Sequence, residues 1–98
     1  MQFHVYRIAR DRLVIDLQSD IPTLPIWVVA PLFPENSDLK ALSILEPIIA
    51  IEGQRSALHV GELAAVPASI LRGDPVADVR AHDYAIRQAL DMIFSGVR

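Results

Sequence analysis

The chain has 98 residues, of which 52% are hydrophobic, and its twelve acidic and nine basic residues give a formal net charge of −3. One core suits this length, so we expect a single domain over residues 1–98, and the apolar excess favours a homodimer over an apolar monomer.

The acidic balance argues against direct nucleic-acid binding, and the lack of cysteine excludes disulfides and a thiol nucleophile. Residues 21–33 are too short and proline-rich to span a membrane, and the first residues lack a secretory signal, so we expect a cytoplasmic protein.

Two runs rich in branched and aromatic residues, 3–8 and 13–17, flank the polar tetrapeptide Ala9-Arg10-Asp11-Arg12. This pattern predicts a β-hairpin. After a proline-containing loop, residues 26–30 form another apolar run and are predicted to be a strand. Pro31 is expected to end its regular pairing or to place it at a sheet edge, because proline has no N–H for the ladder.

A second hairpin is predicted where residues 48–51 and 56–60 flank Glu52-Gly53-Gln54-Arg55, with Gly53 supplying a positive φ. The segments around it are less regular: 34–38 and 72–75 have the composition of loops or turns, and 39–45 fits either a helical turn or an irregular strand.

From Val79 onward the apolar period changes from two to 3.6, which predicts a terminal helix with Asp78 or Asp83 as its N-cap and Ser95 in its last turn. Gly96 stands where a helix usually stops. One face of this helix is apolar and is expected to dock on the core: Ile86, Ala89, Leu90, Ile93 and Phe94. Several short strands closed by one helix predict an α+β or mostly β protein with an antiparallel sheet or small barrel.

The residues that bear chemistry form no recognisable catalytic signature. His59 and Glu62 have the spacing of a metal pair but lack a nearby third ligand, so no metal and no cofactor are expected. His4 is expected to be half-buried and hydrogen-bonded on its strand. Trp27 fits packing in the core or in a dimer interface better than stacking on a ligand. From these residues alone we expect a small binding protein.

A set of short motifs in order along the chain resembles the CcdB family of bacterial toxins, the toxic half of a toxin–antitoxin pair directed at DNA gyrase. The resemblance implies an SH3-like, barrel-type antiparallel sheet of about five strands, a small inserted sheet, one C-terminal α-helix and a two-fold dimer. Residues 33–46 resemble the family poorly. The motifs are Met1-Gln2-Phe3-x-Val5-Tyr6, Asp16-x-Gln18-Ser19-Asp20-Ile21, Pro31-Leu32, Pro47, Val66-Pro67-x-Ser69, Val76-Ala77-Asp78, and Ala89–Phe94 followed by Gly96.

The same resemblance implies a protein inhibitor of gyrase, not an enzyme, with three kinds of partner. The family's gyrase-binding tail, Trp-Gly and an aliphatic residue, falls on Ser95, Gly96 and Val97, so the tryptophan is replaced by serine and weaker inhibition is expected. A second copy completes the homodimer. The resemblance also implies that a CcdA-like antitoxin neutralises the protein, and that the protein contacts DNA only through the antitoxin complex, in transcription autoregulation. The antitoxin-binding counterparts are Ser19, Asp20, Ile21, Asp91 and Phe94.

Two other functions remain open. The missing tryptophan also suits a non-toxic homologue that only binds antitoxin. A MazF-like endoribonuclease would need a cationic groove with an acid–base pair, for which Arg55, His59 or Arg72 would have to serve, and the acidic balance argues against it.

Overall fold

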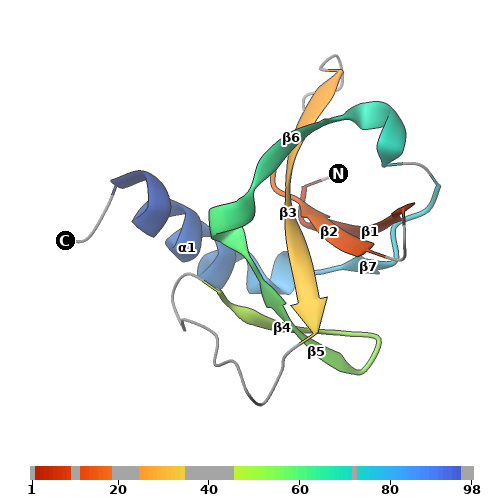
Figure 1. The fold of residues 1–98 in the computed structure, drawn as a ribbon. Helices are drawn as coiled ribbons and strands as arrows, with labels where there is room; N and C mark the ends of the chain where they lie inside the picture. The colour runs from red at the N-terminus through yellow and green to blue at the C-terminus, as the bar shows by residue number, and fades with distance from the viewer. Residues whose placement is uncertain (1, 10–11, 19–24, 35–45, 72, 96–98) are drawn as a thin grey trace.

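The computed structural model describes residues 2–9, 12–18, 25–34, 46–71 and 73–95. In these ranges an antiparallel sheet is combined with one α-helix, α1 (Figure 1). Three short 3₁₀ turns lie between the later elements, at Val60–Glu62, Ala68–Ile70 and Arg80–His82. The strands are β1 (His4–Ile8), β2 (Arg12–Asp16), β3 (Ile26–Pro34), β4 (Ile48–Ile51), β5 (Gln54–Leu58), β6 (Ala64–Pro67) and β7 (Ala77–Asp78), and α1 spans Asp83–Ser95.

The sheet is a nearly closed barrel of six strands in the order β4-β5-β3-β2-β1-β7, with β6 as an extra strand on β3. All of the pairs are antiparallel, and both predicted hairpins, β1–β2 and β4–β5, are confirmed. β3 is the longest strand and lies at the centre, where it pairs with β2 along one edge and with β6 and then β5 along the other. The predicted class, a mostly β barrel with one C-terminal helix, is therefore confirmed.

β3 continues through Pro31 to Pro34, so the expectation that Pro31 ends regular pairing or lies at an edge is wrong. Pro31 lies opposite Val14, and its carbonyl oxygen accepts the N–H of His59 at 2.9 Å. In an antiparallel strand the N–H and C=O of one residue point to the same side. The ring nitrogen of Pro31 therefore faces away from β2, so the β2–β3 ladder loses no hydrogen bond. It faces the edge of β3 at the point where pairing with β6 ends and pairing with β5 begins.

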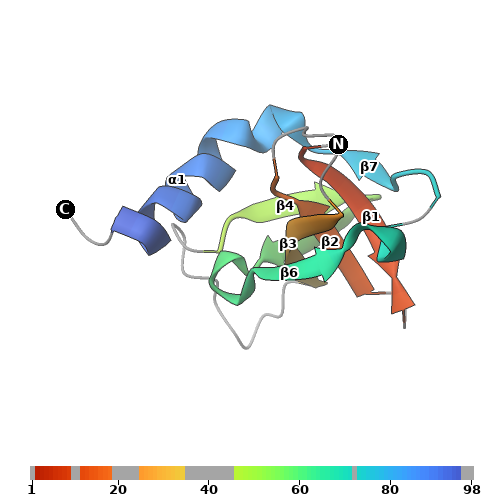
Figure 2. The same cartoon turned by 90° about the horizontal axis from the view of Figure 1, so that it is seen from above.

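The main core fills the barrel and is covered by α1. Val5, Ile15 and Leu58 contribute from the strands, and Ile86 and Ala89 from the helix, and each of these five side chains is fully buried. Figure 2 shows α1 lying across one opening of the sheet.

A second cluster, formed by Tyr6, Val14, Val29 and Leu71, lies apart from the main core. The half-buried Trp27 packs against it, as the core-packing interpretation of this residue predicted.

The β4–β5 hairpin is tighter than predicted, because its loop has two residues instead of four and β5 begins at Gln54. Glu52 and Gly53 have φ values of 51° and 81°. Positive φ at both central residues is the geometry of a type I′ turn, whose twist matches that of the flanking strands. The predicted positive φ of Gly53 is confirmed.

Candidate partner-binding surface

The start of the terminal helix is fixed by two carboxylates. Asp78 accepts the backbone N–H of Arg80 at 3.0 Å and is paired with the Arg80 guanidinium, while Asp83, the first residue of α1, is paired with Arg87 one turn later. The prediction that Asp78 or Asp83 is the N-cap is wrong, because Asp83 is itself the first residue of α1 and Val79 holds the cap position of the 3₁₀ turn before it. Asp78 lies one residue earlier and bonds the N–H of the first residue of that turn. The bonds to Arg80, those of its side chain foremost, lower the pKa of Asp78 from 3.8 to about 2.

The other end of α1 extends beyond the sheet, as Figures 1 and 2 show. The helix is described as far as Ser95, and the predicted stop at Gly96 lies outside the described residues. Leu90 and Ile93 are half-buried against the core, but Phe94 is 72% exposed, so the expectation that Phe94 docks on the core is wrong. The reason is geometric: the barrel ends before the last turn of the helix does. A large aromatic side chain is therefore presented at the helix end.

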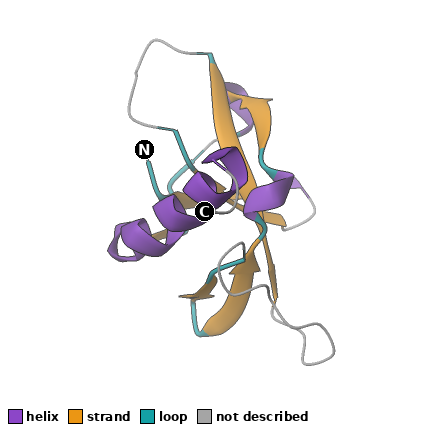
Figure 3. Ribbon diagram, turned by 90° about the vertical axis from the view of Figure 1, so that its left-hand side faces the viewer, coloured by secondary structure: helices purple, strands orange, loops and turns teal. Residues whose placement is uncertain are grey.

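An apolar groove of about 280 Å³ lies beside Phe94, between the barrel and the helix, and is called the helix groove below. It is lined by Leu17, Gln18, Val28, Leu63, Leu90 and Phe94. Figure 3 shows α1 packed across the strands.

The Gln18 wall of this groove is held in place by hydrogen bonds. The Gln18 side-chain oxygen accepts the N–H of Val28 at 3.1 Å, and the Gln18 N–H is donated to the buried carboxylate of Asp16 at 2.9 Å. The segment that leads from β2 toward residues 19–21 is therefore fixed against β3.

The predicted binding residues divide into two groups. Phe94 lines the helix groove, and Asp91 and Phe94 line a second hollow of about 410 Å³ with Arg87 and Leu90. The Ser95 hydroxyl donates to Asp91 Oδ1 at 3.0 Å. The other group lies outside the described residues: Ser19, Asp20, Ile21, Gly96 and Val97.

Sequence reasoning missed most of the groove lining. Gln18 belongs to the Asp16-x-Gln18 motif and Leu90 to the apolar stripe of the helix, so both carried a signal. No sequence signal marked Val28 or Leu63, because these residues join the groove only through the pairing of segments that are distant in the sequence.

The residues considered for metal or ribonuclease chemistry are arranged as follows. His59 Nδ1 and Glu62 Oε2 are 2.7 Å apart, and the His59 ring lies 4.5 Å from that of Phe33. Arg55 is exposed on β5, and Arg72 lies outside the described residues. Among the residues that are described, no three His, Asp or Glu side chains gather in a way that could hold a metal ion. His4 is half-buried, with Nδ1 3.3 Å from the Gln2 carbonyl oxygen, as predicted.

The fold defines the class of protein: a small, mostly β barrel with one terminal helix. The last described turn of this helix lies beside an apolar groove. The chain belongs to the CcdB family: the family model described as CcdB protein matches residues 2–96. A search of curated proteins finds no match. In the part of the chain that is described, no helix has the length and apolar character needed to cross a membrane.

Membership of the CcdB family implies a function. Proteins of the CcdB family are non-enzymatic inhibitors of DNA gyrase, and membership implies a gyrase-poisoning toxin of a toxin–antitoxin system. It also implies an antitoxin and the gyrase A subunit as partners.

Proposed function

We propose that residues 1–98 form one toxin domain that acts as a homodimer, binds the gyrase A subunit through Ser95, Gly96 and Val97, and is neutralised by a CcdA-like antitoxin. Two symmetric helix ends would engage two symmetric sites on gyrase, so the second contact is effectively intramolecular and raises the overall affinity. The observation that carries the proposal is the exposed last turn of α1, at the end of a helix whose Ile86 and Ala89 are fully buried.

The antitoxin site is proposed at Ser19, Asp20, Ile21, Asp91 and Phe94. Support comes from the helix groove, in which Gln18, the residue before Ser19, and Phe94 line the same apolar hollow. A disordered segment that folds as it binds gains affinity by laying apolar side chains into such a groove. The neighbouring Arg87, beside Asp91 in the second hollow, is ion-paired with Asp83 and would exchange that carboxylate for one of an acidic antitoxin segment.

Inhibition of gyrase is proposed to be weak, because Ser95 occupies the position of the family's tryptophan. Losing an aromatic anchor at the centre of an interface costs about 2 kcal/mol or more. The same substitution supports a second candidate, a non-toxic homologue that binds the antitoxin but does not hold gyrase.

A supercoiling assay with purified gyrase separates these functions. The toxin proposal expects inhibition at high protein concentration that is relieved by the C-terminal half of the cognate antitoxin. Antitoxin binding without inhibition, and without binding to a gyrase A fragment, would identify the non-toxic homologue. Cleavage of RNA in the absence of gyrase would instead identify an endoribonuclease.

A further inference from the structure

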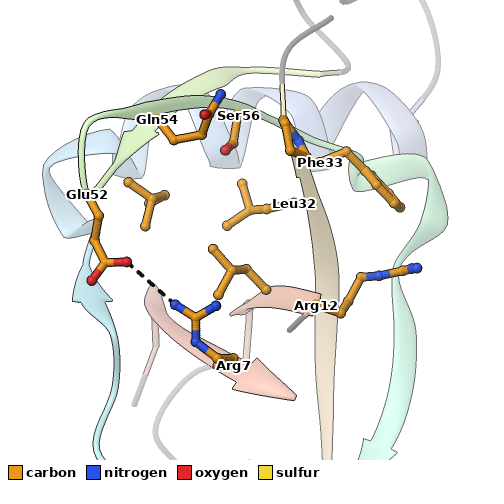
Figure 4. Close-up of a pocket in the computed structure, with 10 residues that line it drawn as sticks. Arg7, Arg12, Leu32, Phe33, Glu52, Gln54 and Ser56 are labelled. Atoms are coloured by element: carbon orange, nitrogen blue, oxygen red, sulfur yellow. Dashed lines mark ion pairs between the residues drawn. The ribbon is translucent and has the colours of Figure 1, made fainter. Parts of the chain in front are cut away.

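The mouth of the barrel, at the end away from the helix groove, contains a partly enclosed cavity of about 320 Å³ (Figure 4). The tip of the β4–β5 hairpin lies on one side and β1 and β2 on the other. Its floor is apolar and includes Leu32 and Ile51, which are 4% and 2% exposed. This volume lies at the lower end of the range for small-molecule pockets, roughly 300–1,000 Å³.

One ion pair spans this mouth. Arg7 Nη2 on β1 and Glu52 Oε1 on the hairpin tip are 3.5 Å apart, and their side chains are 43% and 63% exposed (Figure 4). Charge-assisted N–H···O contacts are usually about 2.7–2.9 Å long, so this pair is loose. The Glu52 carboxylate therefore marks a position at which Arg7 can bind a carboxylate, and the contact between the two residues is not tight.

Two more side chains complete the rim of the cavity. The Arg12 guanidinium lies over the Phe33 ring, 5.0 Å from its centroid, which keeps a second cation at the edge. Ser56 is 3% exposed, lines the cavity, and directs its hydroxyl into it (Figure 4). The described lining therefore has two cations against one carboxylate, a buried hydroxyl and an apolar floor.

We propose that this cavity binds a monoanionic carboxylate carried on a short, branched apolar body. The carboxylate takes the place of Glu52 on Arg7, and the apolar body lies on Leu32 and Ile51 within reach of the Ser56 hydroxyl. A phosphate dianion fits less well, because Glu52 stays nearby and repels a second negative charge more strongly. A free branched-chain acid and a peptide that ends in leucine both carry such a carboxylate on a branched apolar body.

The proposal is tested by titrating the full-length protein with 4-methylpentanoate and following backbone amide shifts by NMR. We expect saturable shifts at the cavity, and none with 4-methylpentanamide, which has the same apolar body without the charge. An acetylated tripeptide ending in leucine, as free acid and as amide, shows whether the peptide source binds in the same way. Inorganic phosphate is expected not to compete.

Two variants are expected to change the affinity for 4-methylpentanoate in opposite directions, a result that misfolding could not produce. R7Q is expected to weaken binding at least about tenfold, because it removes a hydrogen bond to a charged group. E52Q is expected to tighten binding several-fold, because it removes the competing carboxylate. R55Q is the matched control: Arg55 lies next to Ser56 on β5, its side chain is on the opposite face of the strand, and its substitution leaves the affinity unchanged. Equal binding of acid and amide, competition by phosphate, or no tightening in E52Q overturns the proposal.

Discussion

The Ser95 hydroxyl donates a hydrogen bond to the Asp91 carboxylate one turn earlier on α1, with 3.0 Å between Oγ and Oδ1. Both residues are exposed. Ser95 belongs to the proposed gyrase-binding tail and Asp91 to the proposed antitoxin site, so the two proposed sites touch on one turn of helix. An antitoxin seated against Asp91 would therefore cover the residue next to the gyrase contact, which gives neutralisation a direct steric basis.

Ser95→Trp is expected to strengthen gyrase inhibition. The substitution supplies the aromatic anchor that the family has at this position, and such an anchor is worth about 2 kcal/mol, or roughly thirtyfold in affinity. The measurement is the protein concentration that halves supercoiling. Ser95→Ala is the control: it removes the bond to Asp91 without adding an indole, so it should not give this gain. No gain with tryptophan would mean that this turn does not contact gyrase.

Phe94→Ala is expected to weaken binding of the antitoxin's C-terminal half, measured by fluorescence anisotropy, while leaving the free energy of unfolding within about 0.5 kcal/mol. The reason is that Phe94 is 72% exposed and lines the helix groove.

Ile86→Ala provides the contrast on the same helix. Ile86 is fully buried, and truncating such a side chain costs about 2–5 kcal/mol. If Phe94→Ala destabilised the fold as much as Ile86→Ala in urea denaturation, Phe94 would be a packing residue and its part in the antitoxin site would have to be given up.

Local signals in the sequence were sufficient for the hairpins and the helix. Two runs rich in branched and aromatic residues predicted β1 and β2, Gly53 marked the second hairpin, and the period of 3.6 located α1. In each case the residues that decide the structure are neighbours along the chain, so propensity and periodicity carry the information.

Features that depend on distant pairing could not be predicted. Pro31 is tolerated inside β3 because β5 and β6 share that edge, and nothing near Pro31 in the sequence reveals either partner. The helix groove likewise needs Leu63 and Val28 beside Leu90, an arrangement that the barrel creates. Periodicity placed Phe94 on the apolar face of the helix, but only the extent of the barrel determines that this residue is exposed.

Gly53→Ala is expected to destabilise the protein by about 1–2 kcal/mol, because a side chain at φ 81° must adopt the left-handed conformation. An added Cβ at Gly53 would meet no heavy atom within 4 Å, so the effect would be purely conformational. Gly61→Ala is the matched control, since its Cβ would lie in ordinary contact, 3.9 Å from Ile93 Cδ1, and its φ is not in the left-handed region. Equal midpoints for the two variants in urea denaturation would contradict the type I′ turn.

Asp78 is expected to make the protein sensitive to acid. Its bonds to the Arg80 side chain and backbone N–H lower its pKa from 3.8 to about 2, and His4 Nε2, 3.9 Å away, adds a weaker attraction when protonated. Because the folded pKa is the lower one, the contribution to the free energy of unfolding is fully present above about pH 4 and is lost as the pH falls through about 2.

The pKa of Asp78 is measured directly by following its side-chain carboxyl ¹³C shift against pH. Arg80→Gln should move it upward toward 3.8, because the largest cause of its depression is removed. In urea denaturation, Asp78→Asn should flatten the fall in unfolding free energy between about pH 4 and 2, since the substituted side chain no longer titrates. If Arg80→Gln left the carboxyl titration unmoved, the ion pair would not persist in solution, and the 3₁₀ turn before α1 would be held by backbone contacts alone.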